Sequence, residues 1–167
     1  MKKWTIYQIL MLFLIFFQMW FLEYINEIRI IQHSPNGWSA INSAFVTFLI
    51  MALVITCFYL IFLFESKKRK SLLNHSIWAK MPKICVTVGI LSVILFLIGG
   101  TVGPVMAWVE QWRSLLYVFL IYFLFLIFLF IFSIEHKRHQ FTQRNDKSVH
   151  ISYIWTLLLF FALFFLF

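Results

Sequence analysis

Residues 114–134 read SLLYVFLIYFLFLIFLFIFSI and are followed at once by the polar, basic segment EHKRH at 135–139. A charged side chain at the centre of a membrane-spanning helix costs roughly 2.5 to 3.5 kcal/mol, whereas each Leu, Ile, Phe or Val returns only about 0.3 to 0.6 kcal/mol. A long run without charge, bounded by charge, is therefore predicted to cross a membrane as a helix.

Four further segments have the same character, and all 14 Lys and Arg residues and all six acids lie outside the five. A chain that is 63% apolar and 21% aromatic has more apolar surface than a soluble domain of 167 residues could bury. The sequence predicts an all-α integral membrane protein, a single domain in the form of a five-span transmembrane helical bundle. The predicted spans are residues 4–22, 38–64, 84–108, 114–134 and 151–167, the first of which can continue as helix to Ile31.

The charges between the spans predict an orientation. The N-terminus contributes +2, residues 65–83 contribute +5 and residues 135–150 contribute +2, whereas the alternate gaps sum to −1. By the positive-inside rule the basic gaps are cytoplasmic, which places the N-terminus inside and the C-terminus outside. Compactness and the lack of organelle-targeting features favour the cytoplasmic (cell) membrane of a bacterium.

The basic excess also predicts what the chain binds at that surface. Side chains beside a membrane span are attracted to anionic lipid headgroups, which accounts for the net charge of +8 without nucleic acid. The residues expected to make these contacts are Lys67, Lys68, Arg69 and Lys70.

Residues 71–81 carry Leu73, Ile77, Trp78 and Met81 at helical spacing. This pattern is typical of a short amphipathic helix on the membrane surface, which Pro82 is expected to end.

Small and amide residues within the spans indicate where helices pack. Span 84–108 has a face of small residues and is expected at the packed centre, whereas span 114–134 is expected to face lipid widely. Amides in lipid must find partners, so Gln8 and Gln18 are expected to bond to neighbouring helices. The helix-packing candidates are Gln18, Gly89, Ser92, Gly99 and Gly103.

The segment GGTVGP at 99–104 permits two interpretations. Gly99 and Gly103 have the spacing of a small-xxx-small contact, which lets a second helix approach closely. Alternatively, with Pro104, they break the helix beside a cavity. The packing interpretation is favoured.

A mixed cluster of ionisable residues is expected on the outer side. Glu23 and Glu27, one helical turn apart, could hold a cation with His33, but they also suit a solvated helix end. The second interpretation is favoured, and no metal or cofactor is expected. The cluster consists of Glu23, Glu27, His33, Glu110 and Arg113.

A possible internal repeat appears at an offset of 70, where FLFESKK at 62–68 aligns with FSIEHKR at 132–138. Two membrane helices with basic flanks also look alike by constraint alone. The sequence leaves both explanations open and favours the second.

No hydrolase, metalloprotease or redox motif occurs, and no Asp, Glu, Lys, Arg or His lies in the middle of a predicted span. We therefore expect a non-enzymatic accessory, assembly or immunity-type membrane protein, acting through helix contacts with a larger partner or with itself as a homo-oligomer. The alternatives are a subunit of a small permease or channel, and a membrane enzyme with an outer-face polar site.

Overall fold

The computed structural model describes residues 2–31, 39–68, 73, 75–112, 114–139 and 145–165. Every regular element in these residues is a helix, and five of the helices (α1, α2, α3, α5 and α6) are long and apolar enough to cross a membrane. The all-α fold is therefore confirmed. The elements are α1 Lys2–Ile31, α2 Ser39–Ser66, the 3₁₀ helix η2 Ser76–Ala79, α3 Met81–Thr101, α4 Val105–Gln111, α5 Ser114–His139 and α6 Asn145–Phe165.

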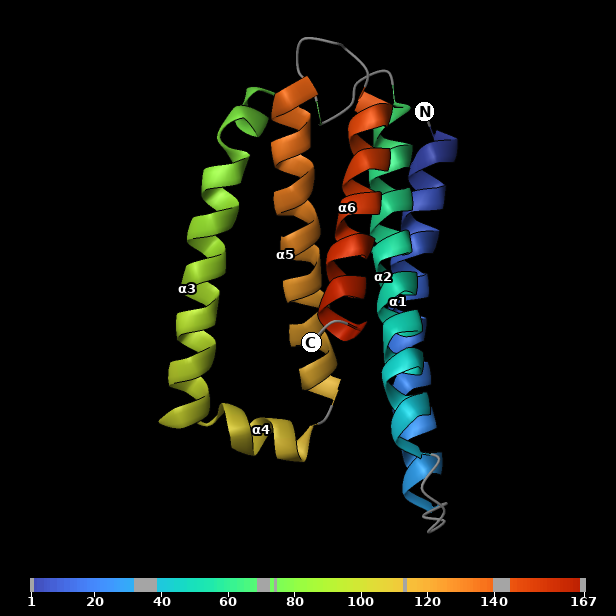
Figure 1. The fold of residues 1–167 in the computed structure, drawn as a ribbon, viewed down its shortest axis with the longest axis vertical. Coiled ribbons are helices and arrows are strands. Elements are labelled where there is room, and N and C mark those ends of the chain that lie inside the picture. The colour runs from blue at the N-terminus through green and yellow to red at the C-terminus, as the bar shows by residue number, and fades with distance from the viewer. Residues whose placement is uncertain are drawn as a thin grey trace.

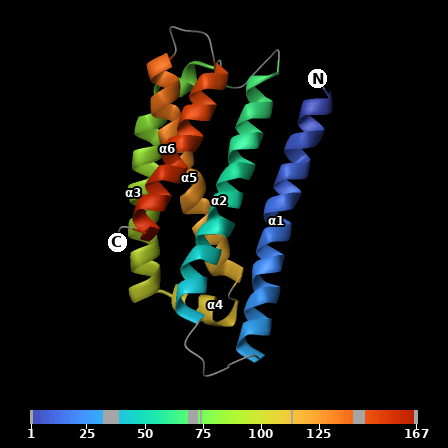
Figure 2. The same cartoon turned by 45° about the vertical axis from the view of Figure 1, so that its right-hand side comes forward.

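The long helices run up and down between two ends of a bundle (Figure 1). The starts of α1, α3 and α6 and the ends of α2 and α5 lie together at what we call the basic end. The opposite end holds the end of α1, the start of α2 and α4. α1 stands at one edge beside α2, as the rotated view also shows (Figure 2), and α3 stands at the other edge beside α5.

The centre of the bundle is α5 and not α3, which corrects the expectation from sequence. Phe128 and Phe132 of α5 are completely buried. Their rings pack on α2, with centroids 6.2 Å apart for Phe58–Phe128 and 4.9 Å apart for Phe62–Phe132. Only 6% of the apolar window of α3 is buried, against 28% for α5. Lipid is as apolar as a leucine side chain, so apolar composition does not distinguish a central helix from a peripheral one.

α6 packs against α2 and α5 through small hydroxyl side chains. Ser148, Ser152 and Thr156 recur every fourth residue and are at most 1% exposed. The Ser152 hydroxyl donates to the Ser148 carbonyl at 2.6 Å, and the Thr156 hydroxyl donates to the Ser152 carbonyl at 2.7 Å. Because these hydroxyls are satisfied within their own helix, neighbouring helices can approach closely.

α6 also begins earlier than the predicted fifth span. Its 21 residues correspond to about 31 Å at 1.5 Å per residue, which is enough for a hydrocarbon core about 30 Å thick. The first predicted span does extend as helix to Ile31.

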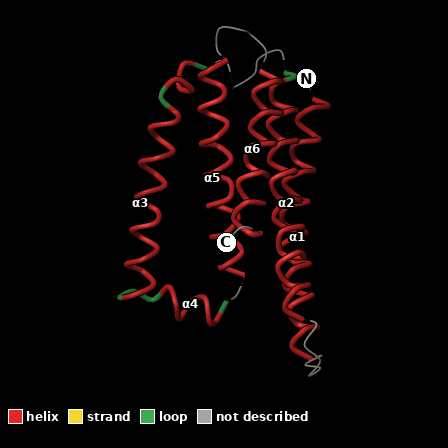
Figure 3. The backbone as a smooth tube through the Cα atoms, in the orientation of Figure 1, coloured by secondary structure: helices red, strands yellow, loops and turns green. Residues whose placement is uncertain are grey.

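The third predicted span, 84–108, is broken. α3 ends at Thr101, and α4 runs crosswise toward α5 (Figure 3). A Cβ at Gly103 would lie 2.8 Å from the Gly99 carbonyl oxygen, and a Cβ at Gly99 would lie 2.6 Å from Val105 Cγ2. Both glycines therefore lie at a tight corner within the chain, where the nearest atoms belong to residues 99 and 105, and a small-xxx-small contact with a helix of another protein stays a prediction.

The predicted amphipathic helix at 71–81 is also wrong in part. Residues 71, 72 and 74 lie outside the described chain, and the helical structure described between 71 and 80 is 3₁₀, at Leu73 and in η2, and not α. Leu73 is 2% exposed, and Trp78 packs on Phe132 with ring centroids 5.2 Å apart, so this segment covers α5. Pro82 does not stop a helix but lies in the first turn of α3, where its missing N–H needs no partner.

Positions 70 residues apart meet in the structure. α2 and α5 run in the same direction, and Phe58 touches Phe128 while Phe62 touches Phe132. Glu65 and Glu135 are both 8% exposed. Equivalent positions are not the only ones in contact, because Phe62 also packs on Phe128 with ring centroids 5.4 Å apart and Phe58 packs on Phe125 at 5.2 Å. Two parallel helices at the same height make such contacts with or without a repeat, so both explanations of the 70-residue offset stay open.

We expect Phe128→Ala to lower the free energy of unfolding by about 3 kcal/mol, because it removes a completely buried ring from the α2–α5 contact. Leu91→Ala on α3, where the side chain is 56% exposed, should cost under about 0.5 kcal/mol. Thermal melting in detergent measures both variants. Equal losses would contradict a bundle centred on α5.

Candidate functional site

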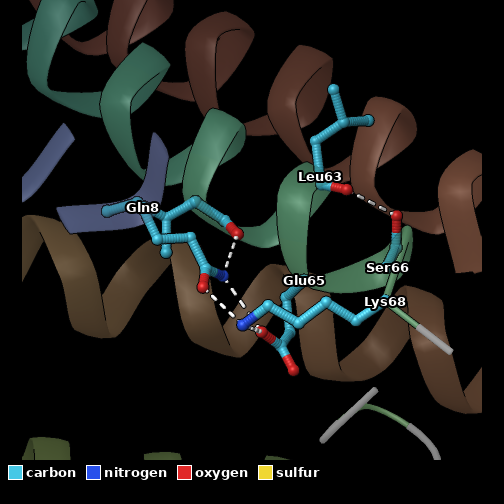
Figure 4. Close-up of polar contacts among 6 residues, drawn as sticks. Gln8, Leu63, Glu65, Ser66 and Lys68 are labelled. Carbon is cyan, nitrogen blue, oxygen red and sulfur yellow. Dashed lines mark hydrogen bonds and ion pairs between the residues drawn. The ribbon is translucent and has the colours of Figure 1, made fainter. Parts of the chain in front are cut away.

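A closed polar network joins α1 to α2 at the basic end (Figure 4). Lys68 Nζ lies 2.6 Å from Glu65 Oε2 and donates to Gln8 Oε1 at 2.5 Å. Gln8 Nε2 donates to Glu65 Oε2 and to the Ile61 carbonyl, both at 3.0 Å. Gln8 therefore bonds to a neighbouring helix, as expected. The pairing gives this buried carboxylate the partners that it needs.

Lys67 also has a partner within the chain. Its ammonium lies 5.4 Å from the centroid of the Trp4 ring, in cation–π geometry. Trp4 in turn packs on Phe64, with ring centroids 5.7 Å apart. Of the four residues predicted to meet lipid headgroups, Lys67 and Lys68 thus hold α1 on α2, and Arg69 and Lys70 lie outside the described chain.

A second set of polar contacts joins α2 to α6. The Tyr59 hydroxyl lies 2.8 Å from His150 Nδ1, and the Thr56 and Tyr153 hydroxyls are 3.1 Å apart. The Tyr59 and Tyr153 rings pack with centroids 4.5 Å apart. These contacts descend from the basic end into the span, and each polar group meets another protein group.

Closer to the basic end, the Ser66 hydroxyl lies within hydrogen-bond reach of the Leu63 carbonyl and of the Asp146 carboxylate. The Leu63 contact is visible in Figure 4. This pair continues the α2–α6 contacts to the helix ends.

Two of the predicted packing residues do cross between helices. Gln18 is 9% exposed, and its Nε2 donates to Cys57 Sγ of α2 at 3.7 Å. Ser92 Oγ lies 2.6 Å from the Tyr122 hydroxyl and so joins α3 to α5. Gly89, in contrast, has no heavy atom within 4 Å of the place where a Cβ would lie. Within the described residues, no side chain of a neighbouring helix occupies the space beside it.

Gly89 instead faces an apolar groove between α3 and α5. This groove encloses about 480 Å³, and its walls include Cys85 and Ile90 of α3 and Phe123 and Phe130 of α5. We call it the α3–α5 groove. None of its lining residues carries a charge or an amide.

Two other grooves are described. One of about 470 Å³ lies beside Ser92, Tyr122 and Val105, and one of about 400 Å³ lies between α5 and α6 beside Glu135 and Trp155. The first adjoins the α3–α4 corner but is lined by apolar side chains and two hydroxyls.

The predicted outer-face cluster falls mostly on side chains that the structure does not describe, so it stays a prediction. Glu110 lies exposed on α4. Glu23 and Glu27 lie in α1, but their side chains, like all of His33 and Arg113, are outside what the structure describes. Among the side chains it does describe, no three His, Cys, Asp or Glu residues are grouped to hold a metal ion.

Two contacts that were not predicted nevertheless have a recognisable pattern in the sequence. Glu65 and Lys68 are three residues apart at a helix end, a spacing that brings opposite charges together. Ser148, Ser152 and Thr156 repeat every four residues, which marks a close helix contact more directly than the glycines of span 84–108.

Comparisons of the chain with protein-family models, with curated proteins and with solved structures found no match. Its class therefore follows from its own helices. Five of them are long and apolar enough to span a membrane, and they indicate a membrane-embedded protein.

We expect Lys68→Met to lower the free energy of unfolding by about 2 kcal/mol, because it leaves the Glu65 carboxylate buried without its ion-pair partner. The double variant Glu65→Gln/Lys68→Met should recover part of the loss. Lys147→Met changes an exposed lysine of α6 and serves as the control. Thermal melting checks the series; no recovery in the double variant would contradict a pairing role.

Proposed function

We propose that this chain is a non-enzymatic, multi-pass membrane protein of the accessory, assembly or immunity type. It acts by packing its helices against a larger membrane protein or against a second copy. We further propose that it lies in a bacterial cytoplasmic membrane with the basic end and the N-terminus inside and the C-terminus outside.

The observation that carries the proposal is a row of exposed side chains on α1, which we call the α1 seam. Its members alternate at spacings of three and four residues and are 49% to 71% exposed. The face of α1 that meets α2 is the opposite one, with Ile15 and Gln18 buried. The seam consists of Ile6, Ile9, Phe13, Phe16 and Trp20.

This spacing is the heptad pattern of helices that cross at about 20° with side chains interdigitated. Phe13, Phe16 and Trp20 are the most exposed large apolar side chains described on α1. Such rings offer large contact areas to a neighbouring helix. The same spacing reaches positions 23 and 27, which are both Glu. A partner helix of complementary chemistry would carry basic residues at that end.

The permease or channel alternative has less support. The groove beside the α3–α4 corner is apolar apart from two hydroxyls, whereas a transport path for ions or polar solutes needs a water-filled lining. No observation favours the outer-face enzyme.

We expect Phe13→Cys and Phe16→Cys to form cross-links in native membranes, to another membrane protein or to a second copy. The background carries Cys57→Ala and Cys85→Ala, which removes both native thiols. Leu91→Cys is the matched control, because its side chain is 56% exposed but lies on α3 at the other edge of the bundle. Gel mobility and mass spectrometry identify the product. Equal cross-linking at Leu91, or none on α1, would refute the α1 seam as the contact.

We expect the orientation to appear in cysteine labelling of intact cells. In the same background, a membrane-impermeant maleimide should label Glu110→Cys from outside and should label Lys80→Cys only after the membrane is opened. Both positions are exposed, and Lys80 lies at the basic end while Glu110 lies on α4. Labelling of both from one side would refute the topology.

A further inference from the structure

We propose that the α3–α5 groove is a binding site for an anionic phospholipid. One acyl chain lies along the groove, and the phosphate sits between Lys83 of α3 and Lys137 of α5. This inference does not depend on the α1 seam, which lies at the opposite edge of the bundle.

The walls of the groove fit a hydrocarbon chain. Val86, Ile90 and Val93 line it from α3, and Phe123, Ile127 and Phe130 line it from α5. Its volume of about 480 Å³ lies within the range of roughly 300 to 1,000 Å³ that small-molecule sites have. Gly89 keeps the groove open, because no side chain fills the space beside its Cα.

Each of the two helices that form the groove also carries a lysine toward the basic end. Lys83 precedes Val86 by three residues and Ile90 by seven, and Lys137 follows Phe130 by seven. At 3.6 residues per turn, residues with these spacings share a face of their helix. The start of α3 and the end of α5 both lie at the basic end (Figure 1), so both lysines lie beyond the lining residues toward that end.

These lysines differ from those of the α1–α2 network. Lys68 is paired with Glu65, and Lys67 lies over Trp4. Lys83 and Lys137 are exposed, and neither makes an ion pair with another described residue. Two ammonium groups beside an apolar groove complement a phosphate that carries an acyl chain.

The distribution of charge favours a lipid over a partner helix. Every residue that lines the groove is apolar, and the exposed cationic side chains of Lys83 and Lys137 lie toward one end of it. An acyl chain that carries a phosphate at one end has the same arrangement.

The test is native mass spectrometry of the full-length protein in detergent with added lipids. Phosphatidylglycerol should bind more tightly than phosphatidylcholine with the same acyl chains, and inorganic phosphate alone should not be retained. Lys83→Gln/Lys137→Gln should weaken phosphatidylglycerol binding about tenfold, because two charge-assisted hydrogen bonds are lost. The matched control Lys3→Gln/Lys147→Gln changes two exposed lysines of α1 and α6 and should leave binding unchanged.

Gly89→Leu tests the groove itself. Open space surrounds the new side chain, so the fold should persist, as an unchanged melting temperature would establish. Binding of both lipids should fall. Equal binding by the two lysine variants, full binding by Gly89→Leu, or equally tight binding of inorganic phosphate would overturn the proposal. So would a specific cross-link from Gly89→Cys to another protein in native membranes.

Discussion

The contact of α5 with α2 is the interaction on which the remaining structure depends. Between helices in lipid there is no hydrophobic driving force, so association rests on close packing and on hydrogen bonds. Phe128 and Phe132 supply the packing against Phe58 and Phe62, mostly with rings edge to face, and all four side chains are buried. α6 lies against both helices, while α1 attaches mainly to α2 and α3 mainly to α5.

Hydrogen bonds then fix how the outer helices are placed. A buried carboxylate is costly without partners, and Glu65 has Lys68 and Gln8. The same contacts tie α1 to α2 near the basic end, and Gln18 ties them again deeper in the span. The basic residues are thereby divided. Some hold helices together, and others, among them Lys83 and Lys137, stay exposed at the basic end.

The sequence predicted the helices well because the cost of inserting each residue in lipid is roughly additive along a span. It also predicted that Gln18 would meet another helix, since amides in lipid need partners, and that Ser92 would lie at a helix contact, since small residues let helices approach closely. It could not predict which helix is central, because Leu and Phe suit lipid and protein equally. The Gly99–Gly103 corner could not be predicted for a related reason. A glycine spacing permits a close approach, but whether by another helix or by the chain's own next turn depends on the tertiary fold.

Positions 70 residues apart meet in α2 and α5, so the pairs α1–α2 and α3–α5 can be compared as two hairpins, each with one outer helix. In the first hairpin, α1 is joined to α2 through Gln8 and Gln18. The second is joined through Ser92 and Tyr122, and at Gly89 it has no side chain to fill the gap. The two hairpins share the α2–α5 centre and diverge in how tightly the outer helix is attached. The opening beside Gly89 is the place where, as we propose, a phospholipid completes the packing.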